Sequence, residues 1–246
     1  MHILIIGKGL MGSSIFKLLK DYNLRVGILG ARELVADFDQ YINAIARQDL
    51  IIECIQEDLA FKRELLFRLS KINEEGLLVS NTSSLSISAL QEDLINPGRF
   101  AGLHFMNPPK LIVNVELVKG AVTQEKTLDS LRIWLESLNR KVSEVIDTPG
   151  FILNALLFSL LNRAAYMFED LEVEPIVLDR MMIDVCGHRL GPLKTLDLIG
   201  IDTSLKILHN LYIQKPEVNL RPARILETLV NKGMLGIKSG EGFYRY

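Results

Sequence analysis

The sequence predicts an α/β protein with a doubly wound parallel sheet over residues 1–148 and an all-helical domain over residues 149–246. Up to Thr148-Pro149-Gly150, short apolar, β-rich runs alternate with helical stretches, which is the pattern of a parallel sheet covered by helices on both faces. After this tripeptide the strand-like runs disappear and long helical patterns take over. A length of 246 residues allows one large domain or two smaller ones, and the change of pattern favours two.

Strands are predicted where short apolar runs rich in β-branched residues occur: His2–Ile6, Arg25–Leu29, Leu50–Cys54, Leu77–Ser80, Ala101–Phe105, Val113–Val118 and Val142–Ile146. Helical patterns lie between them at Met11–Asp21, Asp58–Lys71 and Thr127–Asn139. In the second domain, helices are predicted at Phe151–Leu171, Glu174–Cys186, Lys194–Leu211 and Pro222–Lys232. Glycines lie between these helical patterns and are expected to end them.

Composition and charge exclude several classes of protein. Lys and Arg total 28 against 30 Asp and Glu, a net charge of -2, so no basic excess favours nucleic acid as a partner. The most apolar stretch, Phe151–Phe168, contains polar residues that a lipid-facing helix would not carry. Cys54 and Cys186 have no metal-ligand spacing and the start of the chain has no signal-peptide pattern. We therefore expect no bound metal, no membrane partner and a cytoplasmic location.

A glycine-rich loop follows the first predicted strand and precedes the first predicted helix. Gly7, Gly9 and Gly12 form the pattern GxGxxG, with Leu10 and Met11 inside it. In a dinucleotide-binding loop the first glycine allows a tight turn, the second allows close approach to a pyrophosphate, and the third allows close packing of helix on strand. The sequence therefore predicts a Rossmann-like domain that binds a nicotinamide dinucleotide.

The next position expected to bind the cofactor lacks an acidic side chain. An aspartate or glutamate at the end of the second strand usually holds the adenosine ribose, and here that position is Gly30. Arg32 follows two residues later, which favours NADP over NAD. The alternative is that Gly30 is a turn residue and Arg32 a solvated charge, so both cofactors stay open.

His104 is the candidate catalytic base. It lies near the end of the predicted strand Ala101–Phe105, and the carboxyl ends of strands in an open α/β sheet face the ligand crevice. A histidine is suited to accept the hydroxyl proton when a secondary alcohol is oxidised, because it titrates near working pH. Glu116, on the next predicted strand, is its candidate partner: a carboxylate would fix the tautomer and stabilise the imidazolium.

Two further polar segments are candidate binding positions. Asn81 and Ser83 follow the strand Leu77–Ser80 and reach the same edge of the sheet, although Ser and Thr in this segment would also suit a helix N-cap. Asn154 lies in an apolar helical pattern, where an unpaired amide would cost roughly 1–3 kcal/mol. It is expected either to cap local backbone or to bind ligand between the domains.

The sequence resembles the 3-hydroxyacyl-CoA dehydrogenase family. The resemblance spans nearly the whole chain and rests on these segments: Gly7–Gly12, Ile52–Glu57 with Lys62, Ser80–Leu85, Arg99–Pro109, Val115–Val118, Asp147–Asn154, Leu190–Leu193, Asp197–Asp202 and Gly236–Tyr244. It implies a Rossmann-like domain, a dimerising helical domain like the C-terminal domain of 6-phosphogluconate dehydrogenase, and reversible oxidation of a 3-hydroxyacyl thioester to the 3-ketoacyl thioester. It also implies NAD as the usual cofactor and a homodimer.

The resemblance assigns roles to individual residues. His104 matches the catalytic base, Glu116 its carboxylate partner, and Ser83 and Asn154 the residues that bind the reacting oxygens of the substrate. The implied cofactor-binding positions are the glycine loop, the pair Gly30 and Arg32, and four further residues: Glu57, Lys62, Asn81 and Asn107.

Two departures from the family leave alternatives open. One is Gly30, and the other is a short segment from Ala31 to Asp49, where typical members carry a longer helical segment that helps to bind CoA. The acyl carrier is therefore either CoA or the phosphopantetheine arm of a carrier protein. The alternatives to a thioester dehydrogenase are a non-catalytic dinucleotide-binding protein and a dehydrogenase of a free hydroxy acid, for which Lys110 is the candidate anchor.

Overall fold

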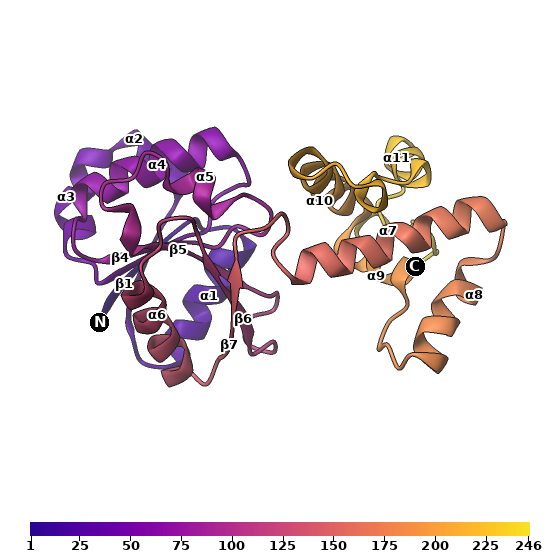
Figure 1. The fold of residues 1–246 in the computed structure, drawn as a ribbon, viewed down its shortest axis with the longest axis horizontal. Helices are drawn as coiled ribbons and strands as arrows, with labels where there is room; N and C mark the ends of the chain where they lie inside the picture. Colours follow the sequence, from indigo (N-terminus) through magenta and orange to yellow (C-terminus); the bar gives the residue numbers. More distant parts are fainter. The chain divides into compact units, whose positions relative to one another are not determined.

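The computed structural model describes all 246 residues, which form two compact units, Met1–Phe151 and Ile152–Tyr246 (Figure 1). The first unit is an α/β sheet domain and the second is helical. The predicted fold class is thus confirmed. The sequence placed the domain boundary between residues 148 and 149, and the chain passes from one unit to the other after Phe151.

A seven-stranded sheet lies at the centre of the first unit, in the order β2-β1-β3-β4-β5-β6-β7. Its strands are β1 His2–Ile6, β2 Arg25–Leu29, β3 Leu50–Glu53, β4 Leu77–Ser80, β5 Phe100–Phe105, β6 Asn114–Lys119 and β7 Lys141–Ile146. All neighbours are parallel except β5 and β6, which are antiparallel. Because β2 lies on one side of β1 and β3 on the other, the chain switches direction there, and such a switch point is where ligands bind in open α/β sheets.

Helices cover both faces of this sheet (Figure 1). They are α1 Leu10–Asp21, α2 Ala31–Ala36, α3 Phe38–Ala46, α4 Leu59–Ile72, α5 Ile87–Gln91 and α6 Glu125–Ser137, with a short 3₁₀ turn at Pro97–Arg99. Successive residues of β1 face opposite ways: Ile3 and Ile5 pack in the core with α1 and α6, whereas Leu4 and Ile6 pack with α2, α3 and α4. Alternate side chains of a strand point to opposite faces, so each apolar strand supplies two cores.

The second unit packs five helices around its own core: α7 Leu153–Leu171, α8 Pro175–Arg180, α9 Pro192–Ile199, α10 Ile201–Gln214 and α11 Arg224–Asn231. A π-helical turn, Met181–Val185, continues α8, and 3₁₀ turns occur at Val218–Leu220 and Ile237–Ser239. No helix of the chain is long and apolar enough to span a bilayer.

Two buried carboxylates hold the second unit together. Asp179 accepts the backbone N–H groups of Leu193 and Lys194 at 2.8 and 3.0 Å, at the start of α9. Asp197 accepts the N–H groups of Phe243 and Tyr244, both at 2.9 Å, which fixes the end of the chain. These bonds satisfy donors that would otherwise be buried without a partner.

Two local predictions are corrected, and one segment holds helices that were not predicted. The helix predicted over Lys194–Leu211 is two helices, because Gly200 between α9 and α10 has φ +99°, which a continuing helix does not allow. The segment Ala31–Asp49, for which no element was predicted, holds α2 and α3. The N-cap of α5 is Ser86, whose hydroxyl accepts the Ala89 N–H at 3.1 Å, so the polar segment before it does not serve as that cap.

Candidate functional site

The glycine loop lies between β1 and α1, at the carboxyl edge of the sheet. Gly7 has φ +120°, and a Cβ there would lie 2.3 Å from the Cys54 carbonyl oxygen. A Cβ at Gly12 would lie 1.9 Å from the Gly7 carbonyl oxygen, whereas a Cβ at Gly9 would meet nothing within 4 Å. Two of the glycines are thus required by packing, and the third leaves open space in front of the backbone.

A cavity of about 550 Å³ adjoins this loop. We call it the glycine-loop cavity, and its lining is Gly7, Lys8, Gly9, Gly30, Ala31, Arg32, Cys54, Ile55, Gln56 and Phe61. Helix α1 starts after Gly9 with no side-chain cap, so its first N–H groups are available to an anion. Leu10 is exposed and Met11 packs against the core. The loop, the bare helix end and the cavity fit the pyrophosphate and adenosine of a dinucleotide.

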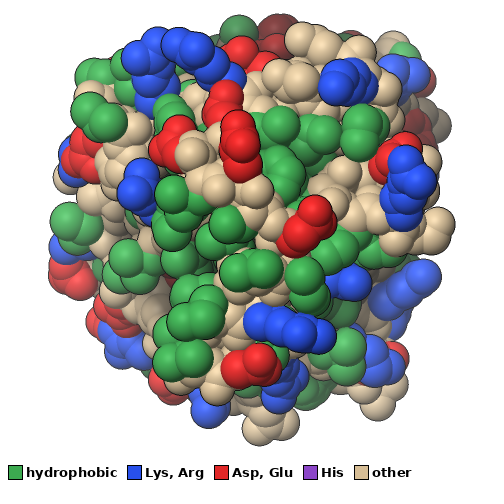
Figure 2. All heavy atoms as spheres, turned by 90° about the vertical axis from the view of Figure 1, so that its right-hand side faces the viewer, with side chains coloured by type: hydrophobic (Ala, Val, Ile, Leu, Met, Phe, Trp, Pro, Cys, Tyr) green, Lys and Arg blue, Asp and Glu red, His purple; other side chains and the backbone are tan.

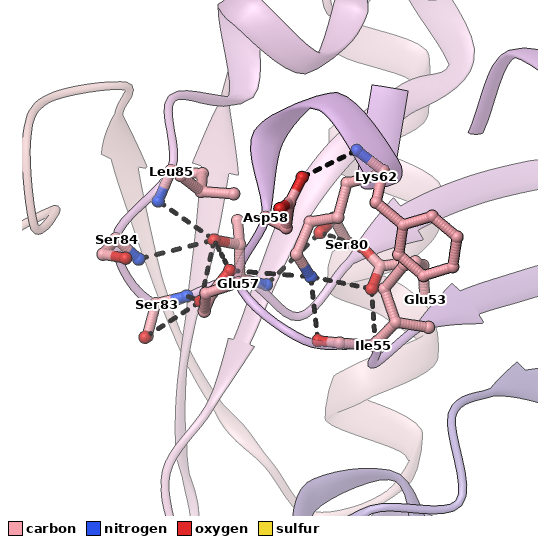
Figure 3. A network of polar contacts seen from close by, with 11 residues as sticks. Glu53, Ile55, Glu57, Asp58, Lys62, Ser80, Ser83, Ser84 and Leu85 are labelled. Atoms are coloured by element: carbon pink, nitrogen blue, oxygen red, sulfur yellow. Dashed lines mark hydrogen bonds and ion pairs between the residues drawn. The ribbon is translucent and has the colours of Figure 1, made fainter. Parts of the chain in front are cut away.

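A buried ion pair lies beside the loop, between β3 and α4. Asp58 begins α4 by accepting the Phe61 N–H at 2.9 Å, and Lys62 then points into the protein with 1% of its surface exposed. Its ammonium donates to Glu53 Oε1 at 2.7 Å and to the Ile55 carbonyl at 3.2 Å (Figure 3). Glu53, which is fully buried, also accepts the Ser80 hydroxyl at 2.6 Å.

Lys62 stays charged in this environment. Burial alone would lower the pKa of its ammonium, but the carboxylates of Glu53 and Glu57 outweigh that effect and hold the pKa above its usual value. The charge of Lys62 therefore depends on the buried Glu53 side chain beside it for compensation.

Glu57 connects this ion pair to the segment that follows β4 (Figure 3). Its carboxylate lies 3.6 Å from the Lys62 ammonium. It accepts the Thr82 hydroxyl at 2.9 Å, and from Ser83 it accepts the backbone N–H at 2.7 Å and the hydroxyl at 3.1 Å. The loop after β3 thus fixes the position of Ser83, and Lys62 fixes the position of Glu57.

His104 and Glu116 lie directly opposite each other on antiparallel strands. The register pairs them, and His104 Nδ1 is 2.8 Å from Glu116 Oε2 with both side chains buried. The Phe151 ring packs against the imidazole with ring centroids 5.7 Å apart. Asn81 accepts the backbone N–H of Phe105 at 2.9 Å, which holds the end of β5 beside the end of β4.

The other predicted positions are distributed differently. Gly30 and Arg32 line the glycine-loop cavity, Asn107 is exposed in the loop after β5, and Asn154 is the second residue of α7, in the second unit. The structure of the first unit brings together Glu57, Lys62 and Ser83 in one network and His104 and Glu116 in one pair. The role of Asn154 stays a prediction.

The sequence did not indicate the roles of Glu53 and Glu33. Glu53 is a carboxylate inside an apolar strand, a pattern that indicates a buried partner, here Lys62 nine residues later. Glu33 follows Gly30 by three residues, which is the spacing of a capping box. Lys8, inside the glycine loop, pairs with it at 2.6 Å.

The side chains do not form a metal site. No group of three or more His, Cys, Asp or Glu residues could hold a metal ion, and both cysteines are free. Burial raises the pKa of the Cys54 thiol well above its usual value, so it stays protonated under the glycine loop.

Comparisons with known proteins agree with this geometry. The family model for the NAD binding domain of 3-hydroxyacyl-CoA dehydrogenase matches residues 33–148, and the model for the C-terminal domain matches residues 150–246. A probable 3-hydroxybutyryl-CoA dehydrogenase of Deinococcus radiodurans is 35% identical over 244 residues, which is 98% of this chain and 86% of that protein. A probable 3-hydroxybutyryl-CoA dehydrogenase of Bacillus subtilis is 36% identical over 208 residues, 84% of this chain and 72% of that protein.

A solved structure also superposes on the whole chain. The crystal structure of (S)-3-hydroxybutyryl-CoA dehydrogenase PaaH1 from Ralstonia eutropha gives a TM-score of 0.90 at 27% identity, covering 100% of this chain and 98% of that one. The superposition includes the first 32 residues, which lie outside the family-model match.

Substitutions in the glycine loop should separate packing from binding. We expect Gly12→Ala to lower the free energy of unfolding by about 1–3 kcal/mol, because its new methyl group meets the Gly7 carbonyl. Gly9→Ala should keep the stability of the parent protein and weaken dinucleotide binding, because its methyl group enters the open space. Urea unfolding and a fluorescence titration with dinucleotide would measure the two effects. Equal losses of stability in both variants would contradict this assignment.

Removal of the buried ammonium should destabilise the first unit. In Lys62→Met the Glu53 carboxylate stays buried without its cation, and we expect the free energy of unfolding to fall by about 3–5 kcal/mol. Lys119→Met is the matched control, because it breaks an exposed pair with Glu125 and should cost less than about 1 kcal/mol. Chemical denaturation measures both, and similar small losses would show that the buried pair is not needed.

Proposed function

The chain belongs to the 3-hydroxyacyl-CoA dehydrogenase family, and on this premise we propose that it oxidises the C3 hydroxyl of a 3-hydroxyacyl thioester with a nicotinamide dinucleotide as hydride acceptor. The observation that carries the proposal is the pair of His104 and Glu116, with 2.8 Å between Nδ1 and Oε2 near the carboxyl end of β5. The dinucleotide requirement is supported by the glycine loop and its cavity.

His104 acts as the general base in this proposal. Glu116 accepts the Nδ1–H, which leaves Nε2 unprotonated and able to take the hydroxyl proton of the substrate. A bound nicotinamide dinucleotide would supply the acceptor for the hydride that leaves C3. The proton on Nε2 makes an imidazolium, and the adjacent carboxylate of Glu116 stabilises that charge. In the reverse direction His104 returns the proton to the ketone oxygen.

Ser83 supplies a second contact to the reacting oxygen. Its hydroxyl donates to Glu57 in this structure, but Glu57 keeps the Ser83 N–H, the Thr82 hydroxyl and the nearby Lys62 ammonium if that bond is released. The hydroxyl can therefore exchange its bond to Glu57 for one to a substrate oxygen, while the Ser83 N–H keeps the backbone in place.

Of the two cofactors, we propose NAD(H). The matching family model describes an NAD binding domain, and the carboxylate of Glu33 lies beside Gly30. NADP(H) is the alternative supported by the cations Lys8 and Arg32, which both line the glycine-loop cavity.

The acyl carrier we propose is CoA, as in the names of the relatives. The alternative, a carrier protein, is supported by the short segment between β2 and β3, which holds only α2 and α3 and buries Leu34, Phe38 and Ile45 in the core. Rates with acetoacetyl-CoA and with an acetoacetyl carrier protein at equal concentration decide between them.

A homodimer through the helical unit is part of this proposal. Exposed apolar side chains gather on α8 and the π-helical turn: Ile176, Val177, Met181 and Val185. Figure 2 shows hydrophobic side chains spread between charged ones on the visible face of the protein. The grouping of exposed apolar side chains on α8 and the π-helical turn favours association with another protein surface. Size-exclusion chromatography with light scattering would give the mass of the assembly, and a monomer at micromolar concentration would contradict the dimer.

Substitution of the base should abolish turnover and keep the fold. We expect His104→Gln to lower kcat by roughly 10²–10⁴-fold, because glutamine takes up no proton at this position, with thermal unfolding close to that of the parent protein. Glu116→Gln should lower kcat less, since the imidazole stays. His209→Gln, on the exposed surface of α10, is the matched control and should keep full activity. The assay follows nicotinamide absorbance with acetoacetyl-CoA.

The same assay tests the alternatives. Full activity of His104→Gln would remove His104 from the mechanism. If the parent protein binds dinucleotide but turns over neither acetoacetyl-CoA nor an acetoacetyl carrier protein, it is a non-catalytic dinucleotide-binding protein. Turnover of free 3-hydroxybutyrate alone would support the hydroxy-acid alternative, although the anchor considered for it, Lys110, is paired with Asp21 at 2.9 Å.

A further inference from the structure

The end of β2 has a carboxylate that the sequence did not reveal. Gly30 follows this strand at the place of the usual ribose-binding acid, and the Glu33 side chain turns back to it from α2. Glu33 Oε2 is 3.3 Å from the Gly30 nitrogen and also 3.3 Å from the position that a Cβ on residue 30 would take. The acidic group absent from position 30 is thus supplied by a side chain three residues later.

Three donors hold this carboxylate in place. Oε2 accepts from the Lys8 ammonium at 2.6 Å as well as from Gly30, and Oε1 accepts the Tyr41 hydroxyl at 3.0 Å. Lys8 comes from the glycine loop and Tyr41 from α3, so Glu33 joins the loop to the short segment between β2 and β3. The bond to Lys8, followed by those to Tyr41 and Gly30, lowers the pKa of Glu33, which therefore stays ionised.

The Glu33 carboxylate still has room for a ligand. An ionised carboxylate has about four acceptor sites, and three donors occupy them here, which leaves one site on Oε1. The side chain is about half exposed, at 44%. It touches Lys8 and Gly30, which both line the glycine-loop cavity. A hydroxyl donor entering this end of the cavity therefore meets a fixed acceptor.

We propose that Glu33 binds the adenosine ribose hydroxyls of NAD(H) and disfavours the 2′-phosphate of NADP(H). This inference rests on the proposed function. A ribose 2′-hydroxyl donates a hydrogen bond, which a carboxylate accepts, whereas a 2′-phosphate brings negative charge and no matching donor. Lys8 is held by Glu33 and is therefore not free to pair with such a phosphate.

Glu33→Gln tests the proposal with little disturbance of the fold. Glutamine also suits the third position of a helix and keeps an acceptor for the Gly30 N–H. In the parent protein we expect NADH to bind more tightly than NADPH. In the variant, the ratio of the two dissociation constants should move toward NADPH by roughly tenfold or more, because a charged acceptor is lost and Lys8 is released.

The measurement is a direct titration of the full chain with NADH and with NADPH, followed by fluorescence or calorimetry. Glu125→Gln is the matched control, because it also breaks an exposed Lys–Glu pair in the first unit, and it should leave the ratio unchanged. Tighter NADPH binding by the parent protein, or an unchanged ratio in Glu33→Gln, would overturn the proposal. If the parent protein binds NADPH more tightly, a selective loss of NADPH affinity in Arg32→Ala would assign cofactor recognition to the cations Lys8 and Arg32 instead.

A relocated carboxylate gives an independent test. Gly30 has φ -74° and ψ 140°, which any residue adopts, so Gly30→Asp in the Glu33→Gln background returns the acid to the strand end. This double variant should regain the NADH preference that the single variant loses, and failure to regain it would count against ribose recognition here. Failure of the proposed function is separate: it would appear as no thioester turnover, whatever the nucleotide ratio.

Discussion

The buried ion pair of Glu53 and Lys62 is the interaction on which the carboxyl edge of the sheet depends. Removing two charges from water costs several kcal/mol for each ion, so such a pair is tolerated only where further hydrogen bonds complete it. Here the Ser80 hydroxyl donates to Glu53 and the Ile55 carbonyl accepts from Lys62. These hydrogen bonds connect β3, β4 and α4. Because Lys62 also faces Glu57, the same ammonium sets the place of the loop that carries Ser83. Packing at the edge and positioning of the proposed substrate contact therefore share one cause.

The strands were predictable because parallel strands buried on both faces are continuous apolar runs, such as Leu77–Ser80, and this pattern is local. The helix break at Gly200 was harder to predict, because a glycine within an apolar helical pattern is compatible with one helix or with two. The contacts of the folded chain determine that two helices form there. His104 and Glu116 were predicted because each lies on a recognisable strand and neighbouring strands tend to pair. Glu53 and Glu33 were not, because their roles arise from residues distant in the sequence, Ser80 for the first and Lys8 for the second.

The two departures from the family pattern that the sequence suggests lie at Gly30 and in the segment from Ala31 to Asp49, away from the proposed catalytic pair. The proposed chemistry uses residues on regular strands, whose register fixes the imidazole against its carboxylate. The segment from Ala31 to Asp49 is short, yet it is well packed through Leu34, Phe38 and Ile45. That packing places α3 so that Tyr41 reaches Glu33. A shorter connection with its own buried core is consistent with a change of contacts at this edge rather than with loss of the site.

Charge alone does not decide which cofactor this edge favours. Lys8 and Glu33 neutralise each other, and Arg32 adds one exposed positive charge, whose effect at about 4 Å in water is only about 1 kcal/mol and falls with added salt. Contact geometry is the stronger factor, because hydrogen bonds to a charged group contribute about 1.5–3 kcal/mol each. A phosphate needs donors within reach, and the Lys8 ammonium is already engaged by Glu33. A ribose hydroxyl needs an acceptor, and Glu33 provides a fixed one, which is the physical basis of the proposed preference for NAD(H).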